Sequence, residues 1–141
     1  MRRYLLDTSV LAALLNNRPG AVSLAAPWMR AHEAATSILA YGEVVEYLRG
    51  LPDPPTRHQA LRSLLREVYP FFVTYRIAER YADIRRQLRP PYGPGLIGDI
   101  DTLIAATALE RNLNVVTIDS DFERVPGLKV RLIPKQELAR R

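Results

Sequence analysis

The feature of this sequence that most restricts its fold is a regular alternation of short apolar segments with longer amphipathic ones. The short segments are rich in aliphatic, aromatic and β-branched residues, as strands are, whereas the longer ones repeat apolar residues every three or four positions, as helices do. The predicted strands cover residues 4–6, 35–38, 71–74, 115–118 and 130–133, and the predicted helices cover 10–15, 21–31, 39–49, 56–67, 77–88 and 103–109. Strands that alternate with helices form a parallel sheet through right-handed crossovers. The sequence therefore predicts an α/β protein with three layers, α/β/α, around a central, mostly parallel sheet.

The size of the chain favours a single domain. A domain of 141 residues buries roughly two thirds of its unfolded surface and needs no disulfide to hold a core. We expect one domain over residues 1–133 and a polar C-terminal tail over residues 134–141. The sequence has no run of about 18 apolar residues, so no membrane span is expected. The apolar stretch before Asp7 is too short for a signal peptide, so we expect a cytoplasmic protein.

Composition excludes some chemistry and favours a polyanionic partner. The chain has no cysteine, which rules out thiol catalysis, disulfides and cysteine-ligated zinc. Its net charge of +5 comes almost entirely from arginine, since Lys129 and Lys135 are the lysines of the sequence. Guanidinium groups bind phosphate bidentately, which suits RNA or DNA. A solvated, arginine-rich surface explains the same composition equally well.

Acidic side chains stand where a parallel sheet would gather them. Asp7 ends the first predicted strand, Asp119 follows the fourth, and Glu43 and Asp101 lie in helices that follow a strand and a loop. Ligands of open parallel sheets bind beyond the carboxyl ends of the strands. Carboxylates that converge there repel one another unless a cation neutralises them, and Mg²⁺ prefers such oxygen ligands. No histidine lies in a pattern that would bind zinc.

Four segments carry a resemblance to a known family: LLDTS, SILAYGE, DTLIAATA and VTIDSDF, at residues 5–9, 37–43, 101–108 and 116–122, with residues 123–128 continuing the last. In this order and spacing they resemble the successive motifs of PIN domains, specifically of VapC-type toxins, over nearly the whole chain. The resemblance implies a PIN-like fold and a magnesium-dependent endoribonuclease that hydrolyses RNA phosphodiester bonds, with Mn²⁺ as the alternative metal. It also implies the toxin role in a type II toxin–antitoxin module, a cognate antitoxin protein as partner, and a homodimer.

The same resemblance assigns the catalytic residues. It implies that Asp7, Glu43, Asp101 and Asp119 form the catalytic group, here called the acidic quartet, and that its three aspartates ligate the metal. An aspartate between a strand and a helix also serves as an N-cap, so Asp7 has a structural role to fill as well. For Glu43 the residues alone favour a solvated helix position, and the match over residues 37–42 reverses that reading.

Two further aspartates compete with members of the quartet. Asp101 directly precedes the x-Leu-Ile-Ala-Ala pattern, so we expect Asp99 to be the N-cap or a favourable charge at the positive end of the helix. Asp119 fits the Thr-x-Asp spacing, so we expect Asp121 to cap the turn of residues 121–124.

Polar residues around the quartet are given supporting roles. Ser9 and Thr117 are expected to orient a ligand or water, or else to bond to the local backbone. Glu46 is expected at the surface, and His32 and His58 are expected there without partners. Arginines are expected to hold flanking RNA phosphates, although each also fits a solvated charge. The candidates are Arg57, Arg62, Arg66, Arg85 and Arg86, with Arg80 and Arg89 beside them.

Three other classes of protein share features with this sequence. A haloacid-dehalogenase-like phosphatase needs Asp-x-Asp after its first strand, but Ser9 occupies the second position. A phospho-acceptor receiver domain needs a lysine that ends a late strand, but Lys129 precedes its strand. A catalytically inactive PIN-like module that binds RNA or protein stays open, because filled acidic positions disfavour it without refuting it.

Overall fold

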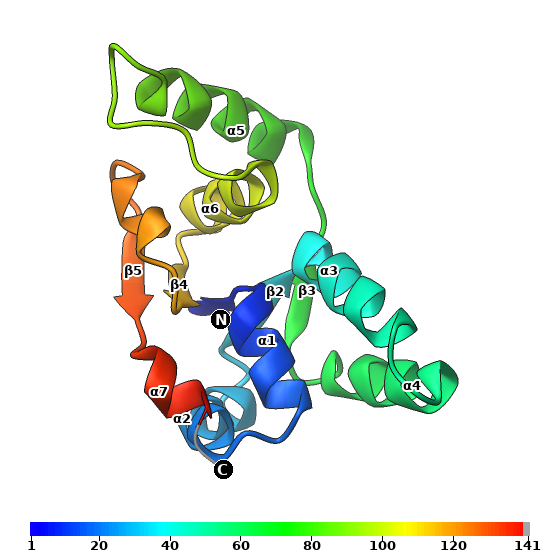
Figure 1. Cartoon of the computed structure of the whole chain (residues 1–141). Helices are drawn as coiled ribbons and strands as arrows, with labels where there is room; N and C mark the ends of the chain where they lie inside the picture. Colours follow the sequence, from blue (N-terminus) through cyan, green and yellow to red (C-terminus); the bar gives the residue numbers. More distant parts are fainter. Residues whose placement is uncertain (140–141) are drawn as a thin grey trace.

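The computed structural model describes residues 1–139, and over that range the chain forms a five-stranded sheet (Figure 1). The strands are β1 (Tyr4–Leu6), β2 (Ala34–Ser37), β3 (Tyr69–Phe71), β4 (Asn114–Thr117) and β5 (Lys129–Leu132). They lie in the order β3-β2-β1-β4-β5, and every neighbouring pair is parallel. The predicted parallel sheet is confirmed.

Helices cover both faces of the sheet, which confirms the three-layer α/β/α architecture (Figure 1). One layer holds α1 (Thr8–Leu15), α2 (Pro19–Arg30), α3 (Ile38–Arg49) and α4 (Pro54–Leu64). The other holds α5 (Tyr75–Leu88) and α6 (Asp99–Arg111), which pack against each other. The 3₁₀ helix η1 (Ser120–Arg124) joins β4 to β5, and α7 (Lys135–Ala139) follows β5. Each layer therefore sends the start of a helix to the carboxyl edge of the sheet.

Most element boundaries differ from the sequence-based prediction by a few residues, and for two elements the structure gives the physical reason. The strand predicted at residues 71–74 is β3, at Tyr69–Phe71, because Thr74 caps α5 by accepting a hydrogen bond from the Ile77 amide at 3.3 Å. The helix predicted from Thr56 starts at Pro54, since proline fits the first helical turn, where its missing N–H has no partner to lose. Residue propensities therefore predicted that β3 and α4 exist but not where they begin and end.

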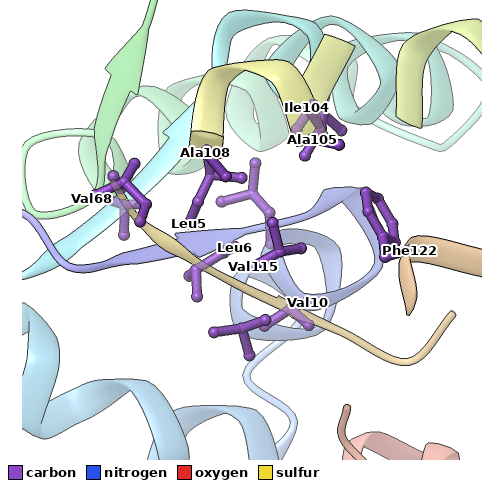
Figure 2. Close-up of a cluster of buried hydrophobic side chains, with 14 of the residues drawn as sticks. Leu5, Leu6, Val10, Val68, Ile104, Ala105, Ala108, Val115 and Phe122 are labelled. Atoms are coloured by element: carbon purple, nitrogen blue, oxygen red, sulfur yellow. The ribbon is translucent and has the colours of Figure 1, made fainter. Parts of the chain in front are cut away.

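The core fills both spaces between the sheet and its helices. Leu5 and Leu6 of β1 are fully buried, and successive strand residues point to opposite faces, so each layer meets an apolar surface. Figure 2 shows this cluster, in which small residues of α6, Ala105 and Ala108, accompany the larger side chains of the strands. Small side chains let α6 lie close to the sheet, which brings its first turn to the strand ends.

The predicted polar tail forms α7 along residues 135–139, and its Leu138 is 6% exposed. This helix lies beside α2 (Figure 1). None of the helices within residues 1–139 is long and apolar enough to cross a membrane.

Candidate active site

Beyond the carboxyl ends of β1 and β4 lies a pocket of about 590 Å³, here called the acidic pocket. Its lining consists of Asp7, Thr8, Ser9, Glu43, Asp101, Ile118, Asp119, Ser120 and Lys135. The whole acidic quartet is in this lining. Side chains separated by more than a hundred positions in sequence therefore share one cavity, as the parallel topology predicts.

Each quartet member is placed by the start of a different helix. Asp7 follows β1 and caps α1 by accepting a hydrogen bond from the Val10 amide at 3.1 Å. Asp119 follows β4 and caps η1 in the same way, with the Asp121 amide at 2.8 Å. Glu43 lies in the second turn of α3, and Asp101 in the first turn of α6. Since α3 and α6 belong to opposite layers, the pocket forms where the layers meet at the sheet edge.

The carboxylate of Asp7 is held on both oxygens. Its side chain is 5% exposed, Ser9 Oγ donates to Oδ1 at 2.6 Å, and Thr117 Oγ1 donates to Oδ2 at 2.5 Å. Burial raises the pKa of Asp7, while these hydrogen bonds and the one from Val10 oppose that rise, and the charge of Asp119 adds to it. Ser9 and Thr117 thus orient this carboxylate, and Thr117 Oγ1 also accepts from the Asp119 amide at 2.9 Å.

Sequence reasoning missed four residues of this lining: Thr8, Ile118, Ser120 and Lys135. Thr8 Oγ1 donates to Glu43 Oε1 at 2.5 Å, which ties the start of α1 to α3. Its position directly after Asp7 was a signal, since the first turn of a helix that starts at a site often faces that site. Lys135 also lines the acidic pocket. Nothing in the sequence pattern indicated that a residue of the tail would reach the site.

The pKa of Asp101 reflects its burial and the neighbouring carboxylates. Burial, followed by the charges of Asp119, Asp7, Glu43 and Asp121 in that order of influence, raises the pKa of Asp101 to about 6. A carboxyl group with such a pKa is partly protonated near neutrality. The pocket therefore carries an excess of negative charge, which a bound cation would neutralise.

We expect Asp101→Asn to stabilise the metal-free protein at pH 7.5 and to lose part of this advantage as the pH falls to 5. The folded-state pKa of about 6 lies above the ordinary 3.8, so the stability contributed by Asp101 is complete below 3.8 and is lost as the pH rises through 6. Asparagine never ionises and avoids that loss. The gain at pH 7.5 should be about 1–2 kcal/mol, because water screens a partly exposed carboxyl group.

Urea unfolding in EDTA at several pH values measures this difference. Asp83→Asn on the exposed face of α5 is the matched control. A gain for Asp101→Asn that is equal at pH 5 and pH 7.5 contradicts the prediction.

The donor set of the acidic pocket fits a hard divalent cation. Its acidic and hydroxyl side chains offer oxygen atoms, and the lining contains neither histidine nor cysteine. Within residues 1–139, no three acidic or histidine side chains are already gathered as a metal-binding cluster. Mg²⁺ retains several waters and needs one or two carboxylates plus substrate phosphates. An open, carboxylate-lined pocket suits Mg²⁺ because the ion can keep several of its waters there.

The two competing aspartates lie outside the lining of the acidic pocket. Gly98 is the N-cap of α6, so Asp99 is not, and Asp99 instead places its charge in the first turn. Its Oδ1 accepts from Arg85 at 2.7 Å and from the Tyr81 hydroxyl at 3.0 Å. The prediction that Asp121 caps its turn is wrong, because η1 begins at Ser120 and a capping side chain must precede the turn.

The arginine candidates divide by their contacts. Arg62 of α4 and Arg66, just beyond the end of that helix, line a second hollow of about 710 Å³ beside Tyr41 and Phe72, and neither forms an ion pair within residues 1–139. His58 is half-buried there and pairs with the Tyr41 hydroxyl at 3.0 Å, so the expectation of a partnerless surface histidine is wrong.

The remaining candidates are engaged with the protein or exposed on α5. Arg57 Nε donates to the Pro52 carbonyl oxygen at 2.6 Å, and Arg85 pairs with Asp99. Arg80 pairs with Glu110 at 3.0 Å. Exposed positions are held by Arg86 and Arg89.

The parallel sheet, its two helical layers and the carboxylate-lined pocket at its edge define an α/β/α protein with an acidic, cation-attracting site. The profile of the PIN domain family matches residues 4–128. The chain therefore belongs to the PIN domain family. No curated protein matches the sequence closely enough to count as a relative.

Solved structures of similar fold include chains of several complexes. One is VapBC from Salmonella typhimurium bound to DNA, with a TM-score of 0.83 and 21% identity over 93% of this chain and 98% of that one. Another is VapBC2 from Rickettsia felis bound to a promoter DNA fragment, with 0.81 and 20% over 92% and 98%. A third is VapBC-1 from nontypeable Haemophilus influenzae, with 0.76 and 23% over 92% and 96%. At such identities the likeness shows the fold.

Proposed function

We propose that this PIN domain is a magnesium-dependent endoribonuclease and the toxin of a type II toxin–antitoxin module. The observation that carries the proposal is the convergence of the acidic quartet on one pocket at the sheet edge. Such clustering is unfavourable without a cation and is what metal-assisted phosphodiester hydrolysis requires. Membership of the PIN domain family supports nuclease chemistry over other uses of an acidic pocket.

Asp7, Asp101 and Asp119 would hold a Mg²⁺ or Mn²⁺ ion, which would supply Lewis-acid activation of a water and of the scissile phosphate. The hydroxyls of Ser9 and Thr117 keep the Asp7 carboxylate in place, so little reorganisation is needed when the ligand binds. Glu43 is steadied at Oε1 by Thr8, and its Oε2 has no hydrogen bond within residues 1–139, so it can accept one from a water in the pocket.

The partners follow from charge and from the similar structures. A net charge of +5, together with Arg62 and Arg66, which form no ion pair within residues 1–139, supports an RNA substrate whose flanking phosphates lie along α4 and the turn after it. One similar structure is described as a toxin–antitoxin complex from Klebsiella pneumoniae and another as a member of the VapBC family of toxin–antitoxin systems from Mycobacterium tuberculosis, which supports a cognate antitoxin. A homodimer is part of the proposal, and sedimentation equilibrium tests it directly.

We expect removal of divalent metal to reduce RNA cleavage by more than about 100-fold, since loss of outer-shell support alone costs 10- to 100-fold in metal enzymes. Purified protein is incubated with total RNA in Mg²⁺, in EDTA, and in EDTA followed by excess Mg²⁺, and the new RNA ends are mapped. Cleavage should appear in the first and third conditions. RNA binding without cleavage in either Mg²⁺ or Mn²⁺ would instead establish the inactive binding module.

A further inference from the structure

A lysine from the end of the chain reaches the acidic pocket. Lys135 is the first residue of α7 and lines the cavity together with the acidic quartet. Within residues 1–139 it is the basic side chain of that lining, and none of the arginines takes part. The sequence has lysine at positions 129 and 135, so a scarce residue type stands at the proposed reaction centre.

The fold holds this lysine in place through the backbone around it. The Ile133 amide donates to the carbonyl oxygen of Thr117 at 2.8 Å, which ties the end of β5 to the residue that holds Asp7. Leu138 anchors α7 in the core, and α7 lies directly on α2 (Figure 1). A Cβ at Gly20 would stand 1.9 Å from the carbonyl oxygen of Glu137, so glycine is needed for this contact. The position of Lys135 is therefore built by packing.

Lys135 shares the cavity with four carboxylates but forms no ion pair with them within residues 1–139. Within residues 1–139, no carboxylate oxygen lies within ion-pair distance of its ammonium group. A lysine that served to balance the quartet would contact one of its members. The ammonium group is instead available to a ligand, and lysine, a compact charge with three donors on a flexible stem, binds phosphate well.

We propose that Lys135 contacts a non-bridging oxygen of the RNA phosphate that enters the acidic pocket. Four carboxylates repel a phosphodiester, and a positive charge from the protein at the same cavity lowers that repulsion. The identity of the ligand rests on the proposed function, whereas the placement of the lysine does not.

Replacement of Lys135 by alanine tests the contact against a matched control, Lys129→Ala. Lys129 is exposed on β5, donates to Asn112 at 3.4 Å, and is absent from the pocket lining. Both changes are made in the full chain, in wild type for kinetics and in an Asp7→Asn background for binding of a short single-stranded RNA in Mg²⁺. We expect Lys135→Ala to weaken RNA binding roughly 10-fold or more, as loss of one hydrogen bond to a charged group does.

The dependence on salt separates a phosphate contact from a general loss of fold. Lys135→Ala should reduce the slope of log affinity against log salt by roughly 0.7, the value for one phosphate contact to a single strand. Lys135→Arg should bind RNA nearly as tightly as the wild type does. Lys129→Ala should leave the KM for RNA cleavage unchanged.

A second variant moves the lysine without removing it. Gly20→Ala forces α7 away from α2 and should weaken RNA binding as Lys135→Ala does, whereas Gly50→Ala, whose Cβ would make an ordinary contact at 3.6 Å, should not. Thermal unfolding confirms that the compared variants are folded, and should Gly20→Ala fail to fold, Lys135→Ala alone decides.

Three results overturn the inference. Equal RNA binding by Lys135→Ala and Lys129→Ala shows that Lys135 touches no phosphate, even though the wild type cleaves RNA. Faster cleavage or tighter Mg²⁺ binding by Lys135→Ala shows that the lysine competes with the cation. A wild type that neither binds nor cleaves RNA overturns the proposed function together with this inference.

Discussion

Replacement of Asp7 by asparagine is expected to reduce RNA cleavage by more than about 100-fold, because a direct metal ligand should matter more than the outer-shell groups whose loss costs 10- to 100-fold. The protein should stay folded. Asparagine still accepts the hydrogen bonds from Ser9 and the Val10 amide that Oδ1 receives now, so the cap of α1 persists. Because burial raises the pKa of Asp7, its ionised form is unfavourable in the metal-free protein, and the unfolding free energy should not fall.

Single-turnover cleavage of a defined RNA and urea unfolding in EDTA measure the two effects. Glu46→Gln is the matched control, because Glu46 is exposed on α3 one turn beyond Glu43 and lies outside the acidic pocket. It should change neither quantity. Cleavage by Asp7→Asn above a tenth of the wild-type rate would refute the assignment of Asp7 as a metal ligand. A large loss of stability would show that Asp7 has a structural role.

Replacement of Phe122 by alanine is expected to produce the opposite pattern, a loss of about 3–5 kcal/mol in unfolding free energy. Phe122 is 0% exposed and is among the largest fully buried side chains described (Figure 2). It lies in η1, shortly after Asp119, so it supports the segment that carries a quartet member. A domain of this size should lose roughly 10–20 °C in Tm.

Phe72→Ala is the control for loss of a phenyl ring, because Phe72 is 64% exposed. Its effect should stay within about 0.5 kcal/mol, as for most surface substitutions. Thermal and urea unfolding measure both variants, and the activity of Phe122→Ala should follow the fraction of folded protein. A destabilisation of less than about 1 kcal/mol would mean that the core around η1 repacks.

The elements of the fold could be predicted because their periodicity is local. Aliphatic runs such as residues 4–6 and 115–118 match β1 and β4, and the helical spacing over residues 77–88 matches most of α5. Boundaries were less predictable where one residue type serves two purposes. Thr74 has high strand propensity and caps a helix, and the proline at position 54 follows one helix while it starts the next.

The acidic quartet could be proposed from motif order, because each member stands at a fixed step from an apolar segment. The partners of the quartet could not, since hydrogen bonds such as Thr8 to Glu43 and Thr117 to Asp7 join elements that are distant in sequence. The same holds for the choice between Asp119 and Asp121 as the cap of η1, which depended on where the turn begins.

The sequence by itself determined the class of fold and the residues that attract a cation, because hydrophobic period and motif spacing are properties of the chain as written. Only the tertiary structure decided which polar groups hold those carboxylates, how far the pKa of Asp101 rises, and that Lys135 joins the site. Burial and charge repulsion depend on distances between residues that are far apart in sequence. The place of Lys135 depends on the packing of α7 on α2, and the sequence of the tail does not indicate that packing.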